Sequence, residues 1–297
     1  MTPPENKTVT TTTPTIGVFD SGFGGLTVLR ALLAHMPHAR FAFIGDTARL
    51  PYGSKSQRTI ARYAAQSARF LVNEQGAKFL VIACNTASAL ALDAIKAAVS
   101  VPVLGVIEPG AEAAAAASRT GDVLVIATDA TVQSHAYAAA CHARGLRALE
   151  KACPLLVPLV EEGWTDTADA TEAPAAHAAA QVAITAEVIR IYLDELNAEA
   201  AALGMNPDTL VLGCTHYPLL RSLFESAVPA GMRVIDSAES AAETAVRAFG
   251  QQDTEALPLA PQALRCFATD SVEKFERLGS RFLGRPVGNV ELVDLGG

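Results

Sequence analysis

The chain has few aromatic residues and fewer basic than acidic residues. Aromatic residues make up 6% of its 297 positions, and 23 Lys and Arg stand against 31 Asp and Glu. The formal net charge of −8 argues against a general phosphate-backbone binder, because nucleic-acid affinity depends largely on Lys and Arg contacts. We therefore expect no nucleic-acid partner.

The cysteines lack the spacing of a disulfide framework or a zinc site. Their number is odd, their separations are wide, and no Cys-x-x-Cys occurs. The five are Cys84, Cys141, Cys153, Cys214 and Cys266. The pattern favours reduced thiols in a cytoplasmic protein and predicts no metal site.

Long apolar runs are also missing. No uninterrupted run reaches the roughly 18 residues of a membrane-spanning helix, so we predict no membrane span. Residues 1–15 are rich in Thr and Pro and lack the apolar core of a signal peptide, which predicts a disordered leader. The length suggests two domains at roughly 100–200 residues each.

Short apolar runs alternate with longer helical patterns along the chain. Such runs read as buried strands of parallel sheets, and the alternation predicts an α/β fold. Helices are expected at 56–75 and 180–203. The expected strands are Ile16–Phe19, Ala42–Ile44, Phe79–Ala83, Val103–Ile107, Val123–Ala127 and Thr209–Leu212.

One short pattern occurs twice. Val81-Ile-Ala-Cys84-Asn-Thr86 resembles Val211-Leu-Gly-Cys214-Thr-His216, in that an apolar run leads to a small residue, a cysteine and polar residues. The cysteines lie 214 − 84 = 130 residues apart, close to one domain length. The repeat indicates two related α/β halves, each offering a cysteine from the end of a strand.

Cys84 and Cys214 are the two thiols best placed for chemistry. Open α/β sheets bind ligands at the carboxyl ends of their strands, and amides at a following helix start stabilise a thiolate. His216, two residues after Cys214, is a candidate partner for that thiol. The alternative for any of these cysteines is a small buried apolar residue.

Two loops follow the first two expected strands. Asp20-Ser-Gly-Phe-Gly-Gly25 departs from a dinucleotide-binding loop, because Thr27 replaces the last glycine and Asp20 would repel a pyrophosphate. Asp20 is instead placed to accept a proton or a substrate ammonium. Pro51 and Gly53 shape the second loop around Tyr52, which can present amides to a carboxylate.

Two further stretches are rich in acidic or polar residues. Glu161 and Glu162 follow an apolar stretch and form either a solvated pair or part of a site. Residues 165–180 are polar and Ala-rich and are expected to form a surface insertion.

The chain resembles the glutamate racemases of the aspartate/glutamate racemase superfamily. The matching motifs run in order from about residue 16 to 240. They are Ile16–Arg30, Gly45–Arg49, Pro51–Gly53, Ala83–Ala87, Gly105–Gly110, Cys153–Glu161 and Gly213–Pro218. A tail around Phe275–Val293 also looks familial.

The resemblance implies two pseudo-symmetric three-layer α/β/α domains with mainly parallel sheets and an active site in the cleft between them. The predicted division is 16–108 plus 235–297 for the first domain and 109–234 for the second. The same resemblance implies interconversion of L-glutamate and D-glutamate for peptidoglycan synthesis, without pyridoxal phosphate or another cofactor. A homodimer is expected.

The resemblance also implies roles for named residues. Cys84 would deprotonate D-glutamate with help from Asp20, and Cys214 would deprotonate L-glutamate with help from His216. Glu161 matches a family carboxylate on the Cys214 side. The expected substrate-binding residues are Asp20, Ser21, Tyr52, Gly53, Asn85, Thr86, Thr131, Thr215 and His216.

Some positions depart from the family pattern, and three other functions remain alternatives. Asp129 precedes Thr131 where a plainer residue is usual, and Ala238 stands where Gly is frequent. The closest alternative is an aspartate racemase, although His216 favours glutamate because aspartate-type relatives usually carry Glu there. A non-catalytic amino-acid-binding protein would not need two opposed thiols. A Rossmann-type oxidoreductase is disfavoured by Thr27 and Asp20.

Overall fold

The structure is a computed structural model that describes residues 14–165, 175–249 and 264–296. The predicted leader lies outside the described residues apart from Pro14 and Thr15. The predicted insertion is described at Thr165 and again from Ala175, where a helix begins, and the residues between lie outside the described part.

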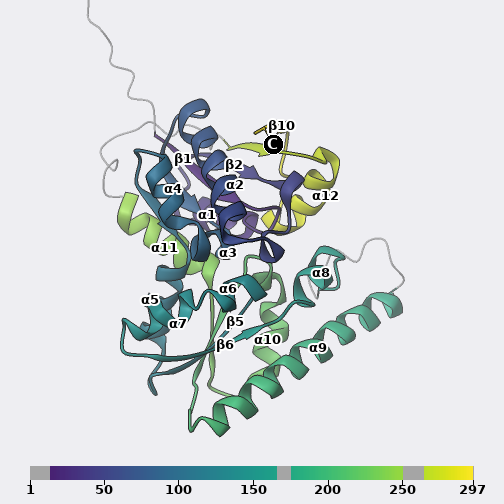
Figure 1. Cartoon of the computed structure of the whole chain (residues 1–297). Helices are drawn as coiled ribbons and strands as arrows, with labels where there is room; N and C mark the ends of the chain where they lie inside the picture. The colour runs from purple at the N-terminus through teal and green to yellow at the C-terminus, as the bar shows by residue number, and fades with distance from the viewer. Residues whose placement is uncertain (1–13, 166–174, 250–263, 297) are drawn as a thin grey trace, which may run out of the picture.

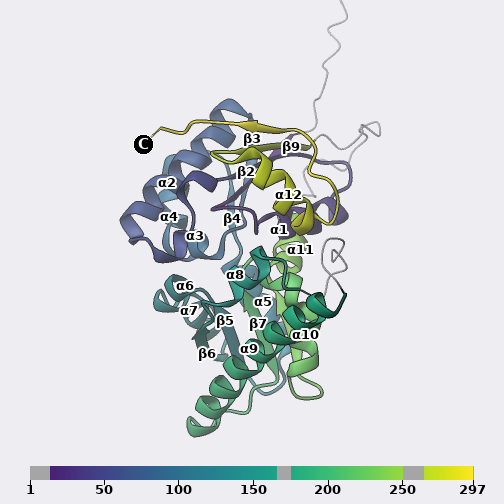
Figure 2. The ribbon, with the colours of Figure 1, turned by 90° about the vertical axis from the view of Figure 1, so that its right-hand side faces the viewer.

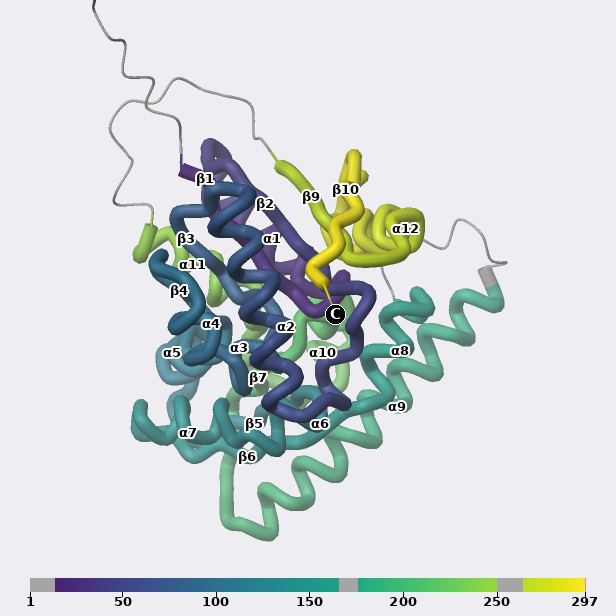
Figure 3. The backbone as a smooth tube through the Cα atoms, turned by 45° about the horizontal axis from the view of Figure 1, so that its top comes forward, coloured from purple at the N-terminus to yellow at the C-terminus, as the bar shows by residue number. Residues whose placement is uncertain are grey.

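The first of two sheets has six parallel strands in the order β10-β9-β2-β1-β3-β4. They are β1 (Thr15–Asp20), β2 (Arg40–Gly45), β3 (Ala77–Ile82), β4 (Val103–Gly105), β9 (Leu264–Ala268) and β10 (Val290–Leu292). β9 and β10 come from the C-terminal part of the chain, yet β9 pairs with β2 and β10 pairs with β9 (Figure 3). The sheet is therefore assembled from both ends of the described chain.

The second sheet has four parallel strands in the order β6-β5-β7-β8. They are β5 (Asp122–Ala127), β6 (Arg147–Ala152), β7 (Thr209–Gly213) and β8 (Arg233–Asp236). Figure 1 shows this sheet below the first one, so that the molecule has two α/β parts stacked on each other.

Helices cover both sheets. Around the first sheet lie α1 (Leu26–His35), α2 (Gln57–Arg69), the π-helical turn η3 (Phe70–Glu74), α3 (Asn85–Leu90), α4 (Leu92–Ala98) and α12 (Val272–Leu283). Around the second lie α5 (Ile107–Ala117), α6 (Asp129–Gln133), α7 (Ala136–His142), α8 (Leu156–Glu161), α9 (Ala175–Ala202) and α10 (Arg221–Ala227). Short 3-10 turns are η1 (Thr47–Arg49), η2 (Tyr52–Ser54) and η4 (Tyr217–Leu220), and α11 is Ser237–Phe249.

Each sheet is the middle layer of three, because neighbouring residues of a strand point to opposite faces. Val18 packs with α1, α11 and α12, whereas Phe19 packs with α2 and α4. In the second sheet Leu124 packs with α8, α9 and α10, and Val125 packs with α5 and α7. Apolar residues on both faces explain why these strands read as continuous apolar runs.

The two α/β parts share one buried apolar cluster. It contains Val18 and Phe43 of the first sheet together with Leu124 and Leu212 of the second. Helix α11 lies at the junction and packs against both α1 and α5 (Figure 2). Burying apolar surface from both parts in one cluster stabilises their mutual position. Residues that follow β1 and β3 of the first sheet and β5 and β7 of the second line one cavity.

Most sequence-based predictions of elements are confirmed. The helix expected at 56–75 is α2 continued by η3, and the one expected at 180–203 is α9, which begins five residues earlier at Ala175. One strand prediction was too long: β4 ends at Gly105, and α5 begins at Ile107. Pro109 in the first turn of α5 is the signal for that helix start, because proline is tolerated there.

The division into domains stays a prediction. We predicted that the chain returns to the first domain at residue 235, but Ile235 and Asp236 still pair with β7 as part of β8. Helix α11 follows from Ser237.

Candidate active site

Cys84 and Cys214 occupy equivalent places in the two sheets. Cys84 follows β3 and is the N-cap of α3, where its sulfur accepts a hydrogen bond from the amide of Ala87 at 3.4 Å. Cys214 follows β7 directly. Both side chains are 5% exposed, and both line a single cavity of about 260 Å³. The predicted meeting of these two thiols is therefore present in the structure.

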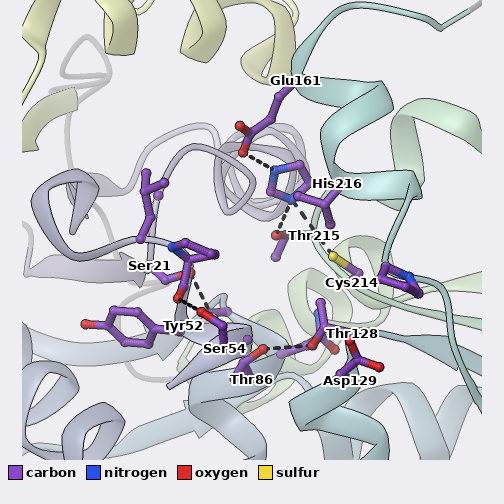
Figure 4. Close-up of a pocket in the computed structure, with 18 of the residues that line it drawn as sticks. Ser21, Tyr52, Ser54, Thr86, Thr128, Asp129, Glu161, Cys214, Thr215 and His216 are labelled. Carbon is purple, nitrogen blue, oxygen red and sulfur yellow. Dashed lines mark hydrogen bonds and ion pairs between the residues drawn. The ribbon is translucent and has the colours of Figure 1, made fainter. Parts of the chain in front are cut away.

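The cavity is lined by both polar and apolar residues, and Figure 4 shows the polar ones with their hydrogen bonds. The polar lining residues besides the cysteines are Ser21, Tyr52, Ser54, Asn85, Thr86, Thr128, Asp129, Glu161, Thr215 and His216. The apolar residues are Phe23, Leu50, Pro51, Pro154, Val157 and Pro158, and Gly22 and Gly53 complete the lining. Within the described residues, no Lys or Arg lines it, so an anionic ligand would be held by hydroxyls, amides and His216.

The surroundings of Cys84 favour its neutral thiol. Burial and the nearby charge of Asp20 raise the pKa of Cys84 to about 12, although hydrogen bonds from Ser21 and Ala87 oppose the shift. Ser21 Oγ lies 3.3 Å from the sulfur. At neutral pH this thiol keeps its proton and can act as an acid.

Asp20 lies behind the cavity wall. Its side chain is 1% exposed and is absent from the residues that line the cavity, and its Oδ2 accepts a hydrogen bond from the Gly22 amide at 2.9 Å. Burial raises the pKa of Asp20, and the charge of His216 and nearby backbone amides oppose this shift. Asp20 therefore does not line the cavity, and its influence on Cys84 is electrostatic.

The surroundings of Cys214 differ because a histidine and a carboxylate adjoin it. His216 Nδ1 lies 3.9 Å from Cys214 Sγ, and His216 Nε2 lies 3.1 Å from Glu161 Oε1. Burial lowers the pKa of His216, but the hydrogen bonds to Cys214 and Glu161 outweigh it and raise that pKa to about 10. His216 is thus an imidazolium at neutral pH, with Cys214 on one side and Glu161 on the other.

Three threonine hydroxyls form a cluster under the cavity. Thr86 Oγ1 lies 3.1 Å from Thr128 Oγ1 and 3.3 Å from Thr131 Oγ1, and Thr128 and Thr131 lie 3.0 Å apart. Thr86 and Thr128 line the cavity, whereas Thr131 is fully buried behind them. The sequence reasoning missed Thr128, although its position directly after β5 is the signal that identified both cysteines.

The side chains of Tyr52 and Asn85 are already engaged within the protein. Tyr52 donates a 2.6 Å hydrogen bond to Asp46, and its hydroxyl points away from the other labelled residues in Figure 4. Asn85 Oδ1 accepts a hydrogen bond from Tyr137 at 2.7 Å, and Nδ2 donates to Ser237 at 3.2 Å. Both residues line the cavity, and both side chains are already hydrogen-bonded within the protein.

Within residues 14–165, 175–249 and 264–296, no group of three or more His, Cys, Asp or Glu side chains is placed to hold a metal ion. Nor does any helix there combine the length and apolarity needed to cross a bilayer.

Comparison with known proteins identifies the family. The model of the Asp/Glu/Hydantoin racemase family matches residues 26–245, well over half of the chain. A glutamate racemase from Koribacter versatilis is 50% identical, and the match covers 96% of this chain and 98% of that one. This chain belongs to the glutamate racemases of the Asp/Glu/Hydantoin racemase family. It is an amino-acid racemase, which is an isomerase.

Solved structures of glutamate racemases have the same fold. One isoform from Bacillus anthracis is 35% identical with a TM-score of 0.81, and coverage is 95% of this chain and 98% of that one. The enzyme from Francisella tularensis, solved with D-glutamate, is 32% identical with a TM-score of 0.80 and the same coverage. An aspartate racemase from Picrophilus torridus is 17% identical with a TM-score of 0.52, which shows the fold alone. The predicted α/β fold with parallel sheets is confirmed.

Gly24 lets the two halves of the racemase site approach each other. A Cβ at this position would lie 2.2 Å from Thr215 Oγ1 and 2.6 Å from His216 Nδ1. We expect Gly24→Ala to lower kcat/KM about 100-fold, because a displacement near 1 Å of catalytic groups costs about that much. Steady-state kinetics, with a thermal melt to check folding, measures the loss.

The control for Gly24→Ala is Gly22→Ala in the same loop. Its added Cβ would meet nothing closer than 3.4 Å. Equal losses of activity in the two variants would contradict the steric explanation.

Proposed function

We propose that this racemase interconverts L-glutamate and D-glutamate by a two-thiol, two-base mechanism without a cofactor. The observation that carries the proposal is the cavity lined by Cys84 from the first α/β part and Cys214 from the second. The 50% identity to a glutamate racemase and the likeness to an enzyme solved with D-glutamate support glutamate as the substrate.

Racemisation removes the Cα proton from one face and returns a proton to the other. Cys214, beside the His216 imidazolium, takes the proton from L-glutamate, and the Cys84 thiol donates one to the opposite face. In the reverse direction Cys84 is the base for D-glutamate, so each thiol serves as both acid and base. Asp20 assists Cys84, and Glu161 holds His216 protonated and oriented.

The carbanion formed between the two steps needs stabilisation, because the α-hydrogen of an amino acid is a very weak acid. Hydroxyls and amides of Ser21, Gly53, Thr86 and Thr215, which line the cavity, would hold the carboxylate and the ammonium. Preorganised donors in a water-poor site stabilise developing charge more strongly than water does. Thr131 supports Thr86 from behind. Asn85 and Tyr52 contribute backbone groups and packing to the cavity wall, because their side chains are hydrogen-bonded within the protein.

The cellular role follows from the resemblance. The D-glutamate would supply peptidoglycan synthesis, and the enzyme would act in the cytoplasm as a homodimer. All five cysteines are free thiols in the structure, which is compatible with a reducing compartment.

Solvent deuterium tests the two-base mechanism. When unlabelled L-glutamate or D-glutamate is racemised in D₂O, we expect the product to carry solvent deuterium at Cα while the substrate recovered early stays unlabelled. The reason is that the proton donor on the second face never held the substrate hydrogen. Product that retains the original hydrogen would refute the mechanism, and mass spectrometry after chiral separation measures it. L-aspartate serves as the substrate control.

A further inference from the structure

We propose that Tyr137 is a positioning residue that fixes the separation of the two catalytic thiols. This inference rests on the proposed two-thiol function. Tyr137 belongs to α7, is fully buried and does not line the cavity. Any influence it has on the reaction must therefore pass through its neighbours.

The ring of Tyr137 lies against the backbone that carries Cys214. A Cβ on Gly213 would come within 2.9 Å of ring atom Cε2, and a Cβ on Gly110 within 3.1 Å of Cε1. Two glycines thus form the slot that holds the ring, and Gly213 directly precedes Cys214. The ring position consequently sets where the end of β7 lies.

The hydroxyl of Tyr137 reaches the residue that follows Cys84. It donates a 2.7 Å hydrogen bond to Asn85 Oδ1, and Asn85 Nδ2 donates in turn to Ser237 Oγ at 3.2 Å. Asn85 is 3% exposed and opens α3, whose N-cap is Cys84. A buried amide with both ends hydrogen-bonded is held in one position.

These contacts form one continuous connection between the thiols. It runs from Cys214 through Gly213 to the Tyr137 ring, and from the Tyr137 hydroxyl through Asn85 to Cys84. Ser237, at the start of α11, anchors the same amide to the helix between the two α/β parts. A two-base reaction requires both sulfurs to face the same carbon from opposite sides, so their separation governs turnover.

The first test replaces only the hydroxyl, by Tyr137→Phe. We expect kcat to fall about 10- to 100-fold in both directions while KM changes by less than about threefold, because the substrate contacts remain and only the thiol geometry changes. A second readout is the exchange of the α-hydrogen with D₂O without inversion. When the opposite thiol is misplaced, the first thiol returns a proton to the same face, so the ratio of exchange to inversion rises.

Tyr63→Phe is the control, since the Tyr63 hydroxyl on α2 accepts an exposed hydrogen bond from Arg62 and Tyr63 does not line the cavity. It should leave kcat and the exchange ratio unchanged. Ser237→Ala removes the other partner of Asn85 and should raise the exchange ratio in the same direction, with a smaller loss of kcat. Circular-dichroism melts check that each variant folds, and Ser237→Ala carries the test if Tyr137→Phe does not fold.

Wild-type kcat and exchange ratio in the folded variants would overturn the role of Tyr137. A loss confined to KM would also overturn it, because it would indicate a substrate contact. The proposed two-thiol function fails on a different result, namely racemisation by a Cys84 or Cys214 variant.

Discussion

Replacing Cys84 or Cys214 with alanine is expected to lower kcat/KM for glutamate racemisation about 10⁴-fold, the upper end of what one positioned acid or base contributes. Each thiol serves one face of the substrate, and within the described residues no third cysteine lines the cavity to replace it. Steady-state rates of racemisation, monitored by circular dichroism from L-glutamate and from D-glutamate, measure the loss.

The single variants should also separate the two half-reactions. Cys84→Ala keeps the thiol that serves L-glutamate and should still exchange its α-hydrogen in D₂O without inversion. Cys214→Ala should do the same with D-glutamate. Exchange of D-glutamate by Cys84→Ala, or of L-glutamate by Cys214→Ala, would reverse the assignment of the two faces.

Cys141→Ala is the control for the loss of a buried thiol. Cys141 is fully buried in the core between α5, α7 and the second sheet and does not line the cavity. Its replacement should lower stability slightly and leave turnover near wild type. Near-normal racemisation by Cys84→Ala or Cys214→Ala would defeat the two-base mechanism.

His216→Asn is expected to lower kcat/KM about 10²–10³-fold, within the range of a group that supports acid–base catalysis. The wild-type imidazolium lies beside Cys214, and a neutral amide would remove this positive charge from the neighbourhood of the sulfur. Glu161 would also lose its cationic partner and remain as an unpaired carboxylate beside an anionic substrate.

The loss in His216→Asn should be equal in the two directions when expressed as kcat/KM. Enantiomers have equal free energies in water, so the equilibrium constant is unity. Because this constant equals the ratio of kcat/KM for L-glutamate to kcat/KM for D-glutamate, the two values of kcat/KM must stay equal. The individual kcat values are free to differ, because only one of the two thiols has lost its partner. Full progress curves from each enantiomer measure both quantities.

His142→Asn provides the control, since His142 is exposed on α7. An activity of His216→Asn within threefold of wild type would show that Cys214 does not depend on the imidazolium. In that case the pairing with Glu161 would be structural only.

The sequence predicted the strands β1, β2, β3, β4, β5 and β7 and missed β6, β8, β9 and β10. β9 lies inside its sheet, but its first two residues are not buried, which shortens its apolar run. Strands β1, β3, β5 and β7 are buried on both faces and therefore appear as apolar runs. Strand β6 (Arg147–Ala152) is at an edge and only partly buried, so it carries Arg, Glu and Lys and shows no such run. β8 and β10 are short strands at edges of their sheets, with exposed residues that hide them in the same way.

Site residues could be predicted from the sequence only where the signal lies in the local sequence. Cys84, Cys214, Asp20 and His216 could be found because each stands at or just after the end of a readable strand. Thr128 has the same signal and was missed. Tyr137 could not be found, because a tyrosine in a short helix has no local feature that ties it to residues 52 positions earlier and 76 positions later.

By itself, the sequence determined that two thiols follow two similar strands, since local apolar pattern and motif order are properties of the chain. The tertiary structure decided how those thiols differ. Burial near Asp20 raises the pKa of the Cys84 thiol, whereas Glu161, 55 residues from His216, keeps an imidazolium beside Cys214. Charge and desolvation depend on which side chains meet in space, so this asymmetry exists only once both sheets have assembled around one cavity.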